Sequence, residues 1–454
     1  MKLIQNIIIF GVLLLLVSCQ KEFLEKKSDK ALLVPTTLED FEFLLNNQLI
    51  MNTAPALGNI SADDYFTTSE AILTLNDYEI NTYLWKKDLF EGQPSPDWTT
   101  AYQQIFYANV VLDGLGKYTS QKTIQEKANT LKGRALFFRA IALYHLTQGF
   151  AEPYDVQTAS SVLGLPVRTS SDVNIISPRG TLKQTYDQII ADLKLAETLL
   201  PVRVTYKTIP YKPAALAMLA RTYLTMGDYI NAEKYADDCL KLEGKLIDYN
   251  LLNPADIRPI PSSIPNGNDE VLFHTSLIAY KFNNRKRSFI AEDVYNLYDN
   301  SDLRRAIFFD KDGNGVITFK GGYSNVDSFC GLATDEILLI RAECAARRKD
   351  LNSALRDINT LLKNRIDKKI FTPFFTNDAE IALDKIISER RKELFGRSIR
   401  WSDLRRLNKE TKYAVTLKRS INNIVYTLPP NDPKYTFPIP DDEIKMSGIP
   451  QNIR

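Results

Sequence analysis

The segment Ala220-Arg-Thr-Tyr-Leu-Thr-Met-Gly227-Asp228-Tyr229-Ile-Asn-Ala232 reads as two helices joined by a Gly-Asp turn. A second copy follows 122 residues later, in which Ala342, Asp350, Leu351 and Ala354 fall on matching positions. Small alanines let two antiparallel helices approach closely, and Gly-Asp makes the tight turn between them, which is the physics of the tetratricopeptide unit. One such unit cannot bury its apolar face alone, so the sequence predicts units that stack.

The same helical spacing continues outward from this repeat. Six apolar residues recur every three or four positions and so form one stripe of a helix: Ile124, Ala128, Leu131, Ala135, Phe138 and Ala142. We interpret residues 131–146 as the first helix of a further, degenerate unit. Thr181 with Gln184 forms a capping box, which predicts a helix that Pro201 ends.

Two more helix starts are predicted nearer the N-terminus. Thr36 followed by Glu39 fits a capping box. Asp97 is placed to cap a long helix whose apolar face includes Trp98. We therefore expect Trp98, and likewise Trp401 in a later amphipathic helix, to belong to the core.

Two stretches, residues 49–96 and 245–334, do not fit the helical pattern and are predicted to be loop-rich insertions. In the second, Val271 to His274 resembles a strand, and residues 307–309 and 316–319 flank a polar turn that predicts a small β-hairpin. The fold class expected is all-α, with tetratricopeptide-like helical hairpins, loop-rich insertions and a small β-hairpin. Long loops on a rigid helical stack are where binding residues tend to lie.

The first 18 residues have the form of a lipoprotein signal peptide. Lys2 gives a positive start, residues 7–17 are apolar apart from Gly11, and small residues precede Cys19. Because a membrane-spanning helix needs about 20 apolar residues, this shorter run favours export and cleavage. We expect lipid attachment at Cys19, a tether over 19–35, and one helical body over 36–454.

The composition excludes some classes of partner. The formal net charge of +2 falls to +1 when Lys2 leaves with the signal peptide, and basic residues are interleaved with acidic ones throughout the chain. Nucleic acid is therefore not an expected partner, because phosphate binding needs a basic stripe. After Cys19, three cysteines remain without a CxxC pair, and we expect Cys239 and Cys344 to be small core residues.

One loop has part of a calcium-binding pattern. Asp310, Asp312 and Asn314 offer side-chain oxygens at alternate positions. The glutamate expected at the twelfth position is Gly321, and the flanking segments look like strands rather than paired helices. A polar turn is the favoured interpretation, calcium is a minor hypothesis, and no other cofactor is expected.

No catalytic constellation is found. Glu389 and Glu393 lie one helical turn apart among many arginines, which should keep carboxylates ionised rather than raise a pKa into an acid's working range. We therefore interpret residues 388–406 as an arginine–carboxylate network that ties helices together. GxSxG, GxxxxGK[ST], GxGxxG and HExxH are absent from the sequence. The chain is not expected to be an enzyme.

Aromatic residues are frequent in the two insertions, beside aspartate and asparagine. Sugar rings stack on aromatic faces, and neighbouring carboxylates and amides can bind ring hydroxyls. Packing of each ring onto the body is the competing interpretation. The ligand-binding candidates are Asp64, Tyr65, Tyr83, Trp85 and Tyr298.

Taken together, these residues resemble the SusD/RagB family of outer-membrane nutrient-binding lipoproteins. The most specific portion is the last third, with Ile386-Ile-Ser-Glu-Arg-Arg-Lys-Glu-Leu394, Arg400-Trp-Ser-Asp-Leu-Arg-Arg406 and Pro438-Ile-Pro440. Arg397-Ser398 departs from the resemblance, which expects Glu-Gly before the Arg-Trp element. The Asn-Pro expected after Glu443-Ile444 is also absent.

The resemblance implies a helical body that covers a SusC-like TonB-dependent transporter and delivers a nutrient to it, most often a glycan. It also implies an outer-membrane, lipid-anchored and surface-exposed location. Three hypotheses remain open at this stage: capture of an oligosaccharide or another nutrient such as a peptide, a purely structural lid, and a glycosidase, which would need two carboxylates across a cleft. The resemblance assigns no ligand residue, since family members carry those contacts on variable loops.

Overall fold

The computed structural model describes residues 35–454, apart from 117, 119–121, 265–266 and 325–327. The predicted signal peptide, Cys19 and most of the tether lie outside the described residues. The helices are α3 (Leu38–Leu45), α4 (Gln48–Met51), α5 (Leu57–Ser61), α6 (Asp77–Tyr83), α7 (Pro96–Leu115), α8 (Lys122–Phe150), α9 (Leu182–Leu199), α10 (Lys212–Met226), α11 (Tyr229–Leu242), α12 (Glu292–Tyr295), α13 (Arg304–Phe308), α14 (Thr334–Arg347), α15 (Leu351–Lys363), α16 (Ala379–Glu393), α17 (Arg400–Leu407) and α18 (Asp441–Ser447). Short 3-10 turns are η1 (Ile72–Thr74), η2 (Tyr249–Leu251), η3 (Lys281–Asn283) and η4 (Pro433–Tyr435). The strands are β1 (Thr53–Ala54), β2 (Leu163–Pro166), β3 (Arg179–Thr181), β4 (Val271–Phe273), β5 (Ser276–Leu277), β6 (Phe309–Lys311), β7 (Ile317–Phe319), β8 (Leu332–Ala333), β9 (Leu417–Ile421) and β10 (Ile424–Leu428).

The repeat forms two helical hairpins, α10–α11 and α14–α15. Gly227 ends α10 in the left-handed conformation, with φ of 75°. Asp228 then caps α11 by accepting from the Asn231 amide at 3.1 Å. In the second hairpin, Lys349 takes the place of the glycine with φ of 66°, and Asp350 caps α15 in the same way. The turn is therefore the same in both copies, although one copy lacks glycine.

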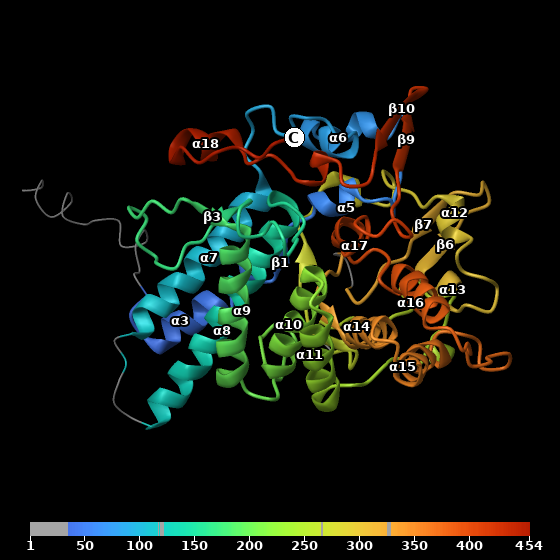
Figure 1. Cartoon of the computed structure of the whole chain (residues 1–454), viewed down its shortest axis with the longest axis horizontal. Helices are drawn as coiled ribbons and strands as arrows, with labels where there is room; N and C mark the ends of the chain where they lie inside the picture. Colours follow the sequence, from blue (N-terminus) through green and yellow to red (C-terminus); the bar gives the residue numbers. More distant parts are fainter. Residues whose placement is uncertain (1–34, 117, 119–121, 265–266, 325–327) are drawn as a thin grey trace, which may run out of the picture.

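The hairpins build a continuous stack. α7 packs on α8, α8 on α9, α9 on α10, α10 on α11, α11 on α14, and α14 on both α15 and α16. Figure 1 shows this row of helices along the lower part of the molecule, with the short elements of the insertions above and to one side. The described strands form five two-stranded sheets. The predicted all-α, tetratricopeptide-like class is confirmed.

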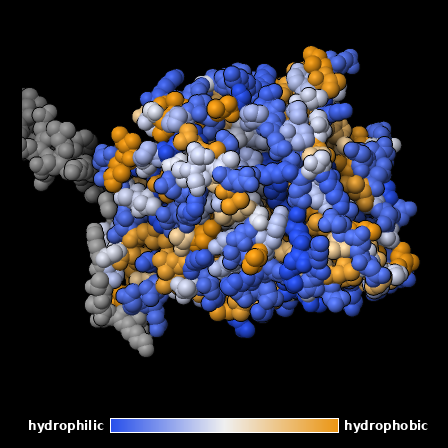
Figure 2. Space-filling model, viewed as in Figure 1, coloured by the Kyte–Doolittle hydropathy of each residue, from blue (hydrophilic) through white to orange (hydrophobic). Residues whose placement is uncertain are grey.

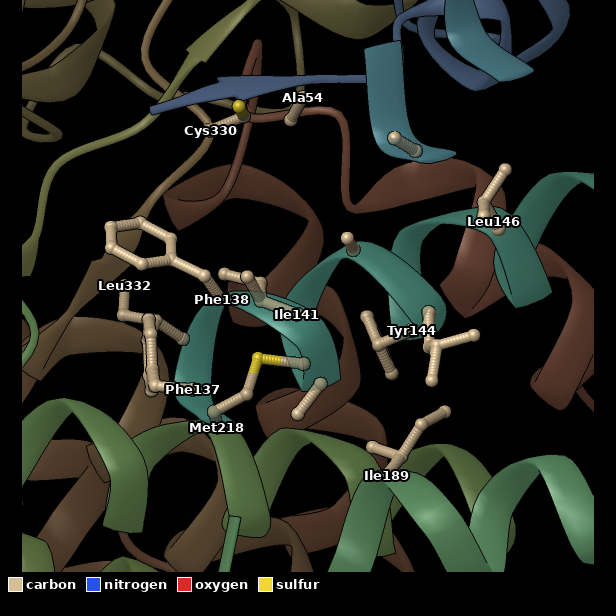
Figure 3. Close-up of a cluster of buried hydrophobic side chains, with 14 of the residues drawn as sticks. Ala54, Phe137, Phe138, Ile141, Tyr144, Leu146, Ile189, Met218, Cys330 and Leu332 are labelled. Carbon is tan, nitrogen blue, oxygen red and sulfur yellow. The ribbon is translucent and has the colours of Figure 1, made fainter. Parts of the chain in front are cut away.

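The main core follows this row of helices. Phe137, Phe138 and Ile141 of α8 face Met218 of α10 and Ile189 of α9, and all are buried (Figure 3). Trp98 and Trp401 are buried at 4% and 2% exposure, as predicted. Cys239, Cys330 and Cys344 are free and buried, which agrees with the core role expected of Cys239 and Cys344.

The insertions contain the predicted small β-hairpin. β6 and β7 pair antiparallel with Phe309 opposite Phe319, and β4 begins at the predicted Val271. β5, which also belongs to the second insertion, pairs in parallel with β1 of the first insertion. The two insertions are thus joined to each other as well as to the helices.

Two of the predicted helix caps differ in the structure. The first capping box is formed by Thr37 and Asp40, one residue later than predicted. The expectation that Asp97 caps its own helix is wrong, because α7 begins at Pro96 after Ser95. Asp97 instead accepts from the amides of Ala56 and Leu57 at the start of α5, with Oδ2 at 3.0 and 2.9 Å. The carboxylate therefore serves a helix 40 residues away.

Among the described helices, none combines the length and the hydrophobicity that a membrane crossing requires. The face shown in Figure 2 is mostly hydrophilic, with scattered apolar residues. An apolar tip protrudes at the β9–β10 hairpin, where Ile424 and Val425 are 56% and 64% exposed.

The turn of the first hairpin gives a stability prediction. Gly227→Ala should lower the free energy of unfolding by about 1 kcal/mol, because an L-residue is disfavoured in the left-handed region. Lys349→Gly is the matched control and should raise stability, since it removes the same strain from the second copy. Urea unfolding followed by circular dichroism measures both. If Gly227→Ala leaves the free energy of unfolding unchanged, the turn relaxes out of the left-handed conformation.

Candidate ligand-binding site

A pocket of about 480 Å³ lies where the two insertions meet the C-terminal part of the chain. Its volume and its mixed aromatic and polar lining are typical of ligand sites. The first insertion contributes Asp63, Tyr65, Phe66, Thr67, Tyr83 and Trp85; the second contributes Ala291, Asp293 and Val294; the C-terminal part contributes Arg391 and residues 415–420.

The two insertions are fixed to each other at Phe66. Its amide donates to the Phe289 carbonyl at 2.9 Å, and the Phe289 amide donates back at 2.8 Å. The rings of the two residues are 5.7 Å apart, and Phe66 stays 39% exposed. Tyr65 beside it is half-buried against Phe282 and Phe395. Together Tyr65 and Phe66 give the pocket its aromatic surface.

The expectation that Tyr83 and Trp85 stack on a ligand needs correction. The two residues are 1% and 2% exposed. The Arg419 guanidinium of β9 lies over both rings, 3.9 Å from the Tyr83 centroid and 4.2 Å from the Trp85 centroid. The indole nitrogen of Trp85 donates to the Ser61 carbonyl at 3.0 Å. These rings support the wall of the pocket and present no free face to it.

Asp64 and Tyr298 also lie in the interior, at 2% and 1% exposure. Burial raises the pKa of Asp64 to about 6. The Tyr298 hydroxyl donates to the Lys392 carbonyl at 2.9 Å, and its ring packs against Phe309 at 5.2 Å. Neither side chain reaches the pocket, so the structure brings only Tyr65, Tyr83 and Trp85 of the predicted set to it, and only Tyr65 is partly accessible.

Asp63 holds the polar side of the pocket in place. Its carboxylate accepts from Arg400 Nε at 2.7 Å and from Arg391 Nη1 at 2.9 Å. Although burial favours the neutral acid, the two guanidinium groups hold the pKa of Asp63 well below its usual range. The contact joins the first insertion to α16 and α17.

The residues that line the pocket carry both buried and exposed polar groups. Arg391 Nε and Thr67 Oγ1 are buried atoms with no hydrogen-bond partner within residues 35–454 as described. The side chains of Asp293 and Lys418 are exposed on the rim. The pocket thus combines hydrogen-bond donors and acceptors with the Tyr65–Phe66 surface.

Family models match most of this chain. Residues 22–224 match the model described as starch-binding associating with outer membrane, and residues 334–453 match the SusD family model. The chain belongs to the SusD family. The first insertion and the stack up to α10 fall in one match, and α14 to α18 fall in the other.

Known relatives agree with this family. SusD-like protein P2 of Formosa agariphila is 30% identical over 168 residues, which are 37% of this chain and 30% of that protein. A SusD superfamily structure from Bacteroides thetaiotaomicron has a TM-score of 0.72 at 22% identity, covering 92% of this chain and 100% of its own. A SusD-like carbohydrate binding protein from Bacteroides vulgatus has a TM-score of 0.67 at 20% identity, covering 91% and 97%. The two structures show that this chain has their fold.

Sequence reasoning missed the contribution of the C-terminal hairpin in this SusD-family chain. Residues 417–421 alternate between buried and exposed positions, so Arg419 points inward between two apolar residues while Lys418 faces outward. Asn422 and Asn423 turn the chain with φ of 50° and 63°. An Asn-Asn turn between alternating segments is a hairpin signal that the sequence contained.

The metal hypothesis at the β6–β7 turn stays a prediction. Asp310 pairs with Arg285 at 3.4 Å, and Asp312 Oδ1 accepts from the amides of Asn314 and Val316 at 2.9 and 2.8 Å. These contacts account for the polar turn by themselves.

A carboxylate cluster elsewhere already holds a cation of the protein. Oxygens of Glu270, Asp335 and Glu393 lie within 4.8 Å of one another. Arg365 donates to Glu270 at 2.5 Å and to Glu393 at 2.7 Å. The guanidinium therefore takes the place that a metal ion would need.

The predicted arginine–carboxylate network is present in α16 and α17. Arg304 pairs with Glu389 at 2.5 Å and with Glu393 at 2.9 Å. Burial favours the neutral acid, but Arg304 and two lysines hold the pKa of Glu389 well below its usual range. The expectation that neighbouring arginines keep the pKa of both carboxylates from rising is wrong for Glu393, whose pKa is raised by complete burial. Both carboxylates are enclosed, away from the pocket.

The Asp63 contact gives a pH-dependent prediction. Asp63→Asn should lower the free energy of unfolding at pH 7 by about 2 kcal/mol, because Arg400 and Arg391 lose a charged partner. The folded-state pKa of Asp63 is lowered, so its contribution is present above the unfolded value of about 3.9 and is lost as pH falls below it. Urea unfolding at pH 7, 5 and 3 should show that the difference in unfolding free energy between Asp63→Asn and the unchanged protein becomes smaller at pH 3.

Asp293→Asn is the control, since it removes an exposed carboxylate of the same pocket. It should leave stability unchanged at each pH. A deficit for Asp63→Asn that stays constant from pH 7 to pH 3 would contradict the assigned role of its charge.

Proposed function

We propose that this chain binds an oligosaccharide in the pocket beside Tyr65 and Phe66 and delivers it to a SusC-like TonB-dependent transporter. The observation that carries the proposal is the convergence of an accessible aromatic surface and polar side chains in one pocket of about 480 Å³. The family description, starch-binding associating with outer membrane, supports the ligand class and the location. The carbohydrate binding named for the Bacteroides vulgatus relative supports it as well.

The chemistry of the pocket suits a sugar. The C–H face of a pyranose ring can pack on the exposed Phe66 ring and the accessible part of Tyr65. The exposed Asp293 carboxylate and Lys418 ammonium on the rim can then bind ring hydroxyls. Because the aromatic surface is held by the Phe66–Phe289 pairing, little ordering of that surface is required on binding.

The same pocket is poorly suited to hydrolysis. A glycosidase needs two carboxyl groups about 5–9.5 Å apart, one of which is a protonated acid. The described carboxylates that line this pocket are Asp63 and Asp293. Asp63 is kept ionised by two guanidinium groups, so it is not placed to donate a proton. The proposal is therefore capture without bond cleavage.

The proposed setting is the outer membrane, with the helical body exposed at the cell surface and anchored through lipid on Cys19. Membership of the SusD family and the predicted lipoprotein signal support the proposed delivery to the transporter. A purely structural lid and a carrier of peptide or another non-glycan nutrient are the alternatives that the binding experiment separates.

Affinity for a panel of oligosaccharides tests the proposal by calorimetry. One glycan class should bind, and Phe66→Ala or Tyr65→Ala should weaken it about tenfold, the effect of losing roughly 1.4 kcal/mol of contact. Phe43→Ala is the matched control, because Phe43 is an aromatic residue on α3 that is 76% exposed and does not line the pocket.

Two kinds of result would contradict the proposal. Binding that survives both aromatic substitutions would place the glycan elsewhere on the surface. If no oligosaccharide of the panel binds but the transporter still co-purifies with the protein from membranes, the structural lid is favoured. If peptides bind instead and their binding depends on Phe66, the proposed cargo changes from a glycan to a peptide.

A further inference from the structure

The connection between β2 and β3 displays apolar side chains to solvent. Val173, Ile175 and Ile176 lie in one short stretch of this loop and are 72%, 50% and 77% exposed. Isolated apolar residues are normal on a protein surface, but a cluster of them marks a contact with a partner or a membrane. In Figure 1 this connection projects on the left of the view, on the same side of the molecule as α3.

Hydrogen bonds at both ends hold this loop in place. At one end, the side-chain amide of Asn109 in α7 donates to the carbonyls of Arg168 and Ser170 at 3.1 and 3.2 Å. At the other end, Arg179 Nη1 donates to the Pro450 carbonyl at 2.8 Å. The apolar side chains therefore point into solvent from a fixed backbone.

Two carboxylates beside the apolar tip accept hydrogen bonds from the loop itself. Asp113 Oδ2 of α7 accepts from the Ser171 amide and hydroxyl at 2.8 and 2.7 Å. Asp172 Oδ1 accepts from the backbone and side-chain amides of Asn174, both at 2.9 Å. Residues 173–176 include no charged side chain. The tip is thus aliphatic, and the nearest acidic groups already have partners.

The predicted tether joins the body at the same end of α7. The Tyr118 hydroxyl donates to the Thr36 carbonyl at 2.5 Å, and α3, which follows Thr36, packs on α7 and α8. Asp113, which holds the loop, lies in the last turn of α7, and Tyr118 follows the end of that helix at Leu115. The loop and the start of the body therefore share one end of one helix.

A lipid on Cys19 would hold this end of the body near a bilayer. The 16 residues from Gln20 to Pro35 can span at most about 55 Å when fully extended. Because the chain enters the body at Thr36, the loop lies on the side of the body to which the anchor is attached.

The composition of the tip favours lipid over a protein partner. Protein contacts that contribute most to affinity are rich in Trp, Tyr and Arg, and the tip has none of these. Val173, Ile175 and Ile176 offer apolar area without a directional group. Hydrocarbon needs no directional group, and apolar area buried in the interface adds to the membrane binding that a lipid chain supplies.

We infer that the loop of residues 171–177 contacts the lipid bilayer and buries Val173, Ile175 and Ile176 at its surface. The inference rests on the lipid anchoring proposed above, because the anchor brings the loop to the bilayer. It adds a second point of contact to the anchor. One point of attachment leaves the body free to turn on its tether, whereas two points determine which side of the body faces the membrane.

Quenching of tryptophan fluorescence by brominated lipid tests this contact in the lipid-anchored protein. Ile176→Trp places an indole at the tip, and Ile230→Trp is the matched control, because Ile230 is 84% exposed on α11, which packs on α10 and α14. Each protein is purified from membranes, reconstituted into phosphatidylcholine vesicles with brominated acyl chains, and recovered by flotation. The emission that each substitution adds should fall at least twofold for Ile176→Trp and stay unchanged for Ile230→Trp.

A further variant separates an apolar contact from proximity through the tether. Val173→Asp with Ile175→Asp should abolish the quenching at Ile176→Trp, because charged groups resist entry into hydrocarbon. Quenching that persists in full in this variant would overturn the inference.

Flotation distinguishes failure of the loop contact from failure of the anchor. If the protein floats with the vesicles but Ile176→Trp is quenched no more than Ile230→Trp, the loop contact is wrong and the proposed anchoring stands. The tip would then be left for a protein partner such as the transporter. If the protein does not float, the proposed lipid anchor is wrong, and the inference is overturned with it.

Discussion

Pairing of buried charges between distant segments is the constraint on which this structure depends. Arg304 and Arg365 are both fully buried. Arg304 contacts Asp302, Glu389 and Glu393, and Arg365 contacts Glu270 and Glu393. Removing one member of such a group leaves an uncompensated charge in the interior, at a cost of about 3–5 kcal/mol. The segments that carry these residues must therefore meet in one arrangement.

The network links parts of the chain that helix packing alone would not fix. The helical row buries its own apolar faces, but the second insertion consists of short elements with few regular backbone bonds. Glu270 and Arg304 belong to that insertion, and Glu389 and Glu393 belong to α16. Once α16 is fixed, Arg391 on the same helix and Arg400 at the start of α17 are placed to bind Asp63. The proposed glycan pocket thus owes its geometry to a charge network that lies outside it.

Local patterns and long-range contacts explain which features could be predicted from the sequence. The Gly227-Asp228 turn and its copy at Asp350 depend on neighbours within a few residues, so spacing was enough to find them. The roles of Tyr83 and Trp85 could not be read in this way. Their rings are covered by Arg419, which is more than 330 residues away in the chain. Loop position suggested exposure, whereas both rings belong to the main hydrophobic core.

Asp97 also shows that a local sequence pattern does not reveal long-range contacts. Its type and position just inside α7 fit a helix start, yet its carboxylate serves the amides of α5 and the hydroxyl of Tyr280. A capping pattern shows that a carboxylate is available and does not show which helix it will serve, since a cap across the fold satisfies the same amides. For this chain, that choice attaches both insertions to the first long helix of the stack, so a residue that looks local helps to fix the position of both insertions.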